Sequence, residues 1–73
     1  MAMPDMIFVS SSNVEAIGYE ATTLELHVRF AKTGITYVYY AVEEWRFQEL
    51  MQADSKGTYL NTYIKPNYQY AKL

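Results

Sequence analysis

Basic and aromatic residues are interleaved near the C-terminal end of the chain. Three lysines and four of the eight tyrosines fall within residues 55–73, and this segment has no acidic residue. Lysines can contact phosphates while tyrosine rings stack on bases, so Lys65 and Tyr68 are candidate contacts for single-stranded nucleic acid. Three lysines would release only about three counterions, so such binding is expected to be weak and salt-sensitive. Two of these tyrosines, which lie beside Leu60 and Ile64, also fit an ordinary helix core.

The tripeptide Ser55-Lys56-Gly57 is a second candidate for anion binding. A helix beginning there would offer unpaired N–H groups to a phosphate, Gly57 would allow close approach, and Lys56 would add charge. The rest of a phosphate-binding glycine loop is missing, so this is not a Walker motif. The alternative is a turn between two helices, in which Ser55 caps the second helix and Gly57 relieves crowding.

The clearest strand pattern runs from Leu24 to Phe30, where apolar and polar residues alternate strictly. This alternation predicts one face in the core and one in water, with His27 and Arg29 on the water side. A neighbouring strand would place Val38 and Tyr40 beside them. RNA-recognition sheets use such an exposed surface to stack bases. An ordinary half-exposed sheet with a cation–aromatic contact explains the same residues.

Trp45 and the pair formed by Glu25 and His27 are the remaining candidates. Trp45 lies off the apolar face of its predicted helix, so it is either an exposed anchor for another protein or a residue packed under Met6–Val9. Glu25 and His27 share a strand face, but no residue marks a nucleophile or an oxyanion site. We therefore expect no catalytic residue and no enzymatic activity.

Strands must position most of these candidates. Alternating patterns predict strands over residues 14–19, 24–30 and 35–40, joined by turns short enough for an antiparallel meander. A bulge or a close backbone contact is expected near Gly18. Gly34 in the second turn can take a positive φ.

After Val42 the apolar spacing becomes helical. It predicts one helix over residues 42–53 and a shorter one over residues 55–64, which ends before Pro66. The expected fold class is therefore α+β, a three-stranded antiparallel sheet meander packed on one face by two short helices.

Composition limits the function classes further. The chain has 73 residues, a net charge of −2 and no cysteine, so it is one small domain without a disulfide or zinc–thiolate site. With a single histidine, no metal and no cofactor are expected. No apolar run approaches the length of a membrane span, and no basic region precedes the apolar residues near the N-terminus. We expect a cytoplasmic protein that is a monomer or a weak homo-oligomer.

Several short motifs together resemble a known family, the KTSC domain. They are Ser11-Ser12-Asn13-Val14, Ala16-Ile17-Gly18-Tyr19-Glu20, Leu24, Val28, Phe30, Gly34, Tyr37-Val38-Tyr39, Val42, Ala53-Asp54-Ser55-Lys56-Gly57 and Ile64-Lys65. The combination of Tyr37 and Tyr39 with the later Ser-Lys-Gly is the most specific part. Glu20 and Glu43 stand where the family usually has Asp and Pro, and the first hairpin is shorter.

The resemblance implies a module named for the C-terminus of some lysyl-tRNA synthetases and also found as a free-standing bacterial or phage protein. It divides the chain into an N-terminal segment 1–10, a domain 11–68 and a tail 69–73. In the family reading, Tyr37 and Tyr39 are the core pair. RNA binding is what attachment to synthetases implies. We therefore expect a non-catalytic module that binds single-stranded RNA, and the alternative is a protein-interaction or self-association module.

Overall fold

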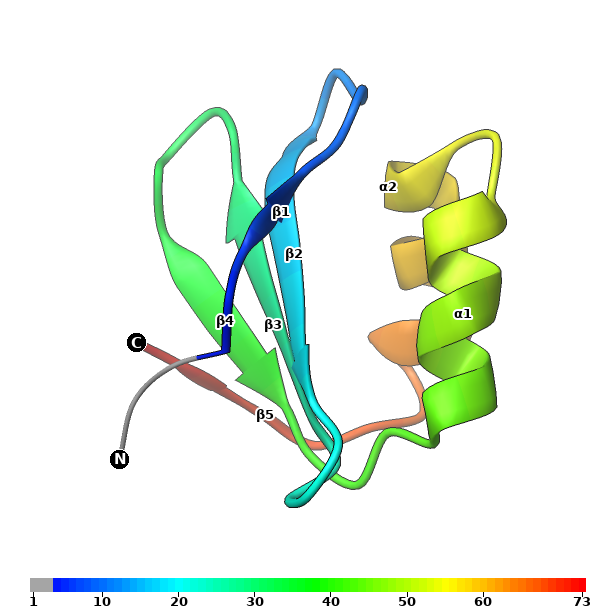
Figure 1. Ribbon diagram of the computed structural model, residues 1–73. Helices are drawn as coiled ribbons and strands as arrows, with labels where there is room; N and C mark the ends of the chain where they lie inside the picture. Colours follow the sequence, from blue (N-terminus) through cyan, green and yellow to red (C-terminus); the bar gives the residue numbers. More distant parts are fainter. Residues whose placement is uncertain (1–3) are drawn as a thin grey trace.

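The computed structural model describes residues 4–73. An antiparallel sheet forms one layer and the helices cover one of its faces (Figure 1). Its five strands lie in sequence order: β1 (Ile7–Phe8), β2 (Val14–Glu20), β3 (Glu25–Phe30), β4 (Thr36–Tyr39) and β5 (Tyr70–Lys72). The helical elements are α1 (Glu44–Gln52), α2 (Lys56–Tyr59) and the π-helical turn η1 (Leu60–Ile64), all between β4 and β5.

The predicted α+β class with an antiparallel meander and two helices is confirmed, but the number of strands was wrong. β1 and β5 add a short edge strand to each side of the expected three. They contain two and three residues, too few to show an alternating pattern. Both come from segments outside residues 11–68, so the sheet draws on almost the whole chain.

The helix-facing side of the sheet builds the core. One row of paired residues across β2, β3, β4 and β5 is Tyr19, Leu26, Tyr39 and Tyr70. Leu26 is fully buried and Tyr39 almost so, and both pack with Leu50 of α1 and with the helical residues after it. This confirms that Tyr39 is a core residue, and Tyr37 packs against the same core from the next row.

The opposite face is not the open surface predicted from the alternation. A second row there consists of Gly18, His27, Val38 and Ala71. His27 is 5% exposed and Val38 is 3% exposed, so their placement on a solvent face was wrong. A Cβ on Gly18 would lie 2.8 Å from Met6 Sδ and 2.9 Å from the Asp5 carbonyl oxygen, which shows that residues 4–6 pack over this row at Gly18. The close backbone contact expected at Gly18 is therefore confirmed.

The turns explain where the strand pattern misled. Leu24 was expected on the core face of a strand, but it lies in a turn with φ +59° and is 41% exposed. Glu20 closes this turn by accepting hydrogen bonds from the backbone and hydroxyl of Thr22. Gly34 has φ +71°, as predicted for the second turn.

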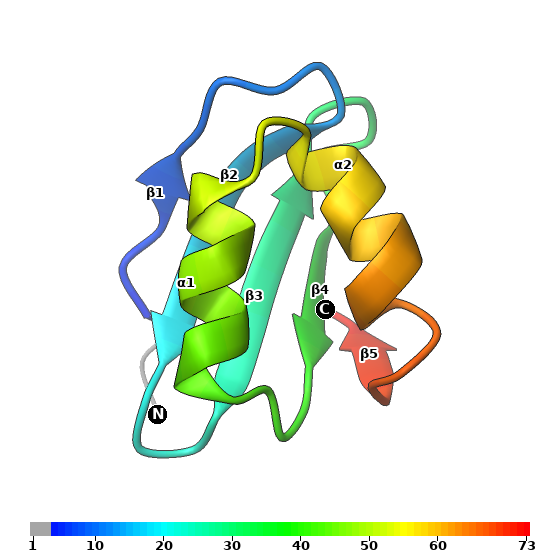
Figure 2. The ribbon, with the colours of Figure 1, turned by 90° about the vertical axis from the view of Figure 1, so that its right-hand side faces the viewer.

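The helices are close to the predicted ranges. Helix α1 begins at Glu44, two residues after the predicted start, and ends one residue before the predicted end. α2 and η1 continue without a break from Lys56 to Ile64, and only the last five residues adopt the wider π-helical turn. Two residues of this segment, Leu60 and Ile64, are fully buried. The segment packs on the sheet beside α1 (Figure 2).

Candidate ligand-binding site

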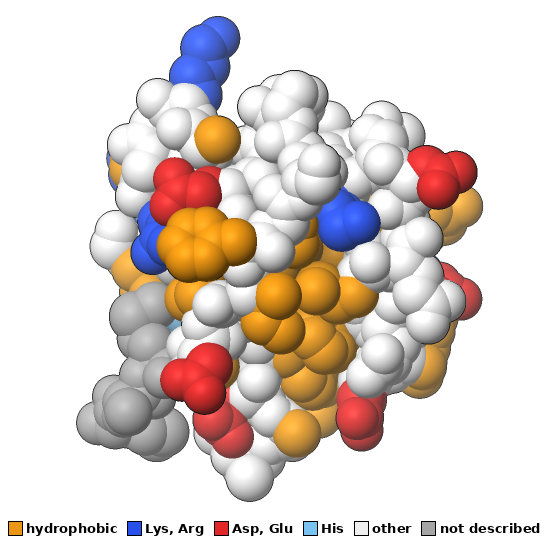
Figure 3. All heavy atoms as spheres, turned by 45° about the horizontal axis from the view of Figure 1, so that its top comes forward, with side chains coloured by type: hydrophobic (Ala, Val, Ile, Leu, Met, Phe, Trp, Pro, Cys, Tyr) orange, Lys and Arg blue, Asp and Glu red, His pale blue; other side chains and the backbone are white. Residues whose placement is uncertain are grey.

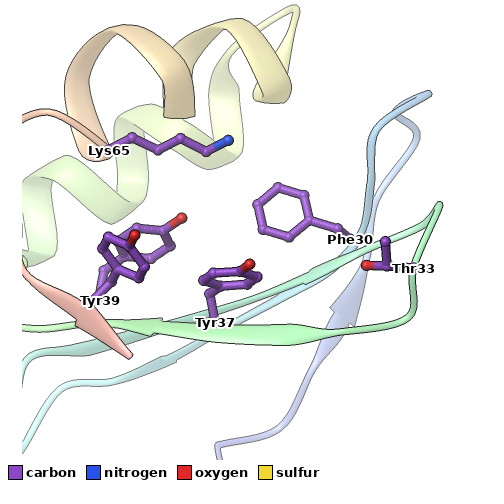
Figure 4. Close-up of a pocket in the computed structure, with 6 residues that line it drawn as sticks. Phe30, Thr33, Tyr37, Tyr39 and Lys65 are labelled. Carbon is purple, nitrogen blue, oxygen red and sulfur yellow. The ribbon is translucent and has the colours of Figure 1, made fainter. Parts of the chain in front are cut away.

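A cavity of about 460 Å³ opens between the C-terminal end of η1 and the edge of the sheet formed by β4 and β5. Its lining contains four aromatic rings, one lysine and one threonine: Phe30, Thr33, Tyr37, Tyr39, Lys65 and Tyr70. Figure 4 shows the rings rising from the strands while Lys65 extends above them from the helical layer. We refer to this cavity as the aromatic pocket.

Strand pairing sets the spacing of the rings. Tyr39 pairs with Tyr70, and Tyr37 is two residues away from Tyr39 on the same face. The ring of Tyr70 consequently lies 5.7 Å from that of Tyr37 and 5.8 Å from that of Tyr39, centre to centre. Phe30 meets Tyr37 edge-on at 5.5 Å. Tyr70 is 58% exposed, so the pocket has one accessible ring and an otherwise recessed aromatic wall.

Lys65 supplies the charge of the pocket. It follows the last residue of η1, and its Nζ lies 5.2 Å from the centre of the Phe30 ring. Burial, with neighbouring Tyr37 and Tyr70, raises the pKa of Tyr39 to about 12, so this phenol stays protonated and neutral at physiological pH. No acidic residue is among the described residues that line the pocket. An aromatic wall beside one cation suits a flat ring that carries an anionic group.

The other nucleic-acid candidates are not gathered here. Tyr68 and Tyr40 lie together at a shallower hollow of about 310 Å³ on another part of the surface. Arg29 pairs with Glu15 at 2.8 Å and its guanidinium lies 5.8 Å from the ring centre of the exposed Phe8. His27 is buried in the sheet opposite Gly18, and its Nδ1 makes no hydrogen bond to any described residue. Burial lowers the pKa of His27, so it is neutral near pH 7.

The Ser55-Lys56-Gly57 tripeptide has the geometry of the turn alternative. Ser55 accepts a hydrogen bond from the Thr58 amide at 3.3 Å, which is a helix cap. Lys56 Nζ turns back and donates to the Ala53 carbonyl oxygen at 2.9 Å. Gly57 is buried, and a Cβ there would lie 2.9 Å from Asn13 Nδ2. Anion binding at this tripeptide stays an untested prediction. Its lysine already donates a hydrogen bond within the chain.

Arg46 organises a separate aromatic cluster on the helical layer. Its guanidinium lies 4.3 Å from the ring of Trp45 and 5.3 Å from that of Tyr63, and it donates to the hydroxyls of Tyr59 and Tyr68. Those hydroxyls donate to Glu49 and Glu43 respectively. Hydrogen bonding from Tyr68 lowers the pKa of Glu43, and the two tyrosine hydroxyls raise the pKa of Arg46. Tyr68 is therefore held by this cluster.

The sequence missed several wall residues. Tyr70 follows no periodic pattern, because β5 has only three residues, and Thr33 was read only as part of a turn. Phe30 was assigned to the core alone. The signal that could have found Tyr70 is its place among the interleaved lysines and tyrosines of residues 55–73.

The structure also bears on two broader expectations. Among residues 4–73, no helix is long and apolar enough to cross a membrane. No cluster of three or more histidine, cysteine, aspartate or glutamate side chains with metal-binding geometry occurs in the part of the chain that the structure describes.

The chain belongs to the KTSC domain family, whose pattern it matches over residues 10–68. It resembles a protein of Tsukamurella paurometabola, with 39% identity over 61 residues that cover 84% of this chain and 90% of the relative. An uncharacterized protein of Stutzerimonas stutzeri is 34% identical over 68 residues, or 92% and 94% of the two chains. The crystal structure of a KTSC domain protein from Yersinia pestis superimposes with a TM-score of 0.90 at 36% identity, covering 99% of each chain.

Proposed function

We propose that this protein is a non-catalytic module that binds single-stranded RNA, with one base held in the aromatic pocket. The observation that carries the proposal is the position of Lys65 over a wall of four aromatic rings, one of which is exposed. Bases stack on aromatic side chains whatever their sequence, and a lysine nearby neutralises the adjoining phosphate.

The size and charge of the pocket support this ligand class. Pockets that bind small ligands span about 300–1,000 Å³, and the volume of about 460 Å³ falls in that range. The chain as a whole carries a net charge of −2, yet the described residues lining the pocket bring a positive charge and no negative one. An anionic ligand would therefore meet a locally positive surface at this pocket despite the net negative charge of the chain.

One lysine also limits the strength of binding. Each phosphate contact changes the slope of log affinity against log salt by about 0.7 for single strands. Binding should therefore be weak and should disappear at moderate salt. The expected assay is fluorescence anisotropy of a short labelled RNA strand at low salt and high protein concentration.

Two pairs of variants test the assignment of the pocket. Tyr70→Ala removes the exposed ring and should cost about 1 to 3 kcal/mol of binding free energy without changing the salt slope. Tyr63→Ala is its control, because Tyr63 is similarly exposed (45%) but lies in the Arg46 cluster. Lys65→Ala should reduce the salt slope by about 0.7, whereas Lys56→Ala should leave it unchanged because Lys56 lies outside the pocket.

Circular dichroism should show that all four variants remain folded. Equal losses from Tyr70→Ala and Tyr63→Ala would move the site away from the pocket. Absence of any anisotropy change with the wild-type protein would refute the RNA proposal itself.

Protein interaction is the second candidate function, and the Arg46 cluster favours it. Trp45 is 52% exposed and is stacked against the Arg46 guanidinium, so its ring is held in place before any partner arrives. Interface centres are enriched in Trp, Tyr and Arg, the residue types of this cluster. The face drawn in Figure 3 carries a further gathering of hydrophobic side chains near its centre, with acidic side chains at several points around it.

Self-association is the simplest form of this second candidate to test. Sedimentation equilibrium over a range of concentrations should then show a mass above that of the monomer, and Trp45→Ala should return the monomer mass. A monomer mass throughout would exclude self-association through Trp45.

A further inference from the structure

A second hollow continues from the aromatic pocket on the other side of Phe30. It has a volume of about 190 Å³ and is lined by Asn13, Phe30, Lys32, Gly57, Asn61 and Lys65. Phe30 and Lys65 line both cavities, so the two share a wall. Figure 4 shows these two side chains facing each other from the sheet and the helical layer.

The second hollow lies where the segment before β2 meets the helical layer. The segment before β2 approaches the helical layer where Gly57 has no side chain, with Asn13 Nδ2 2.9 Å from the place of a Cβ. The Asn13 carbonyl oxygen accepts a hydrogen bond from the Ala31 amide at 3.0 Å, which fixes this segment against the end of β3. On the helix, Gly57, Asn61 and Lys65 are each four residues apart and therefore share one side.

The polar groups of the second hollow differ from those of the aromatic pocket. Asn13 and Asn61 are exposed, and neither side-chain amide forms a hydrogen bond with another described residue. A side-chain amide offers two donors and an acceptor, which match the edge of a base. Lys32 adds a second cation, and none of the described residues lining either cavity is acidic.

We infer that the two cavities form one site for two consecutive nucleotides of a single strand. The first base stacks in the aromatic pocket, the phosphodiester between the nucleotides lies against Lys65, and the second base meets the amides of Asn61 and Asn13. Lys65 fits the linking phosphate because, among the described residues, it is the one charged residue common to both linings. Lys32 then faces the phosphate that follows. This inference rests on the proposed RNA-binding function and specifies its smallest full ligand.

The test compares dinucleoside monophosphates (ApA, CpC, GpG and UpU) with the corresponding nucleoside 5′-monophosphates. NMR titration of the wild-type protein gives the affinity for each compound. A dinucleoside monophosphate carries less charge than a nucleotide with a terminal phosphate, so electrostatic attraction alone predicts weaker binding. We expect at least one of the four to bind about 5-fold or more tightly than its mononucleotide, because it adds a second base contact.

Variants then separate the two halves of the site. Asn61→Ala should lower the affinity for the preferred dinucleoside monophosphate by about 2- to 12-fold, the usual range for one net hydrogen bond. The affinity for the mononucleotide should stay unchanged. Gln48→Ala is the matched control, since it removes an exposed amide from α1, outside both linings. Tyr70→Ala should lower the affinity for both ligands. The amide signals of Gly57 and Asn13 should shift with the dinucleoside monophosphate and not with the mononucleotide.

The outcomes distinguish this inference from the proposed function. Equal affinity for both ligand types, together with no effect of Asn61→Ala, would overturn the two-nucleotide site while leaving the single-base pocket in place. Binding of none of the eight compounds, and of no longer RNA strand, would overturn the proposed function as well.

Discussion

Replacing Gly18 by alanine perturbs the outer face of the sheet at a crowded point. The new Cβ would lie 2.8 Å from Met6 Sδ, 2.9 Å from the Asp5 carbonyl oxygen and 3.3 Å from Pro4 Cγ. Met6 can move its side chain, but the Asp5 oxygen belongs to the backbone and moves only if residues 4–6 move together. The substitution should therefore lift this segment away from β2.

The expected cost follows from two opposing effects. Overpacking of a well-packed region costs about 1 to 3 kcal/mol, while replacing a strand glycine by alanine returns about 0.5 to 1 kcal/mol of conformational entropy. Because the blocking atom is backbone, we expect the upper part of the range, a net loss of about 1.5 to 2.5 kcal/mol. For a domain of this size each kcal/mol lowers the melting temperature by about 4 to 8 °C.

Thermal unfolding, monitored by circular dichroism, measures the loss of stability. An NMR titration of His27 tests whether residues 4–6 have moved. His27 lies beside Gly18 in the same row, and burial holds its pKa low. Lifting residues 4–6 should bring that pKa back toward its ordinary value. The matched control is Gly57→Ala, where only the end of the exposed Asn13 side chain must move and where alanine favours a helix by about 1 kcal/mol. A Gly18→Ala protein as stable as wild type, with an unchanged His27 pKa, would refute the reasoning.

Three further perturbations test other parts of the structure. Leu26→Ala should cost about 2 to 5 kcal/mol in chemical denaturation, because Leu26 is fully buried; a loss below 1 kcal/mol would contradict its place in the core. Since the folded pKa of His27 is lowered, its contribution to stability is complete above an unfolded pKa of about 6.5 and should decline as pH falls toward the folded pKa. His27→Gln should flatten the pH dependence of the free energy of unfolding between neutral pH and pH 5. An unaltered pH dependence would mean that other groups cause it. Arg46→Ala should cost about 1 to 3 kcal/mol and change the emission of Trp45, the single tryptophan, because it removes the stacked guanidinium; unchanged emission would mean that Arg46 does not hold that ring.

The sequence predicted the parts of the fold that have a long enough pattern. The three central strands, the Gly34 turn and both helices have clear periods, and they appear close to the expected positions. Leu24 fits the alternating pattern by its residue type, but it belongs to the turn before β3, which is one residue longer than the pattern suggests. The edge strands are too short to be read from periodicity at all.

The candidate site was predicted only in part, for a related reason. Lys65 was predicted as a phosphate contact and Tyr37 and Tyr39 as a core pair, and the structure places all three in the lining of one pocket. His27 was misplaced because alternation indicates which residues share a face but not whether another segment covers that face. Residues 4–6 cover that face at Gly18, the strand partner of His27, and Tyr70 reaches the pocket through a strand that the sequence did not reveal.

The position of β5 has a consequence for how the protein would respond to its ligand. The strand that carries the exposed wall of the aromatic pocket is a three-residue edge strand, held to β4 by a short ladder that includes Leu73 N–H donating to the Thr36 carbonyl oxygen at 2.9 Å. Short edge elements with exposed side chains open locally at a much smaller free energy than the core. In hydrogen exchange, the ladder amides of residues 70–73 should therefore exchange well before those of β3. A ligand seated against Tyr70 should slow that exchange, because the strand must be in place for the pocket to exist.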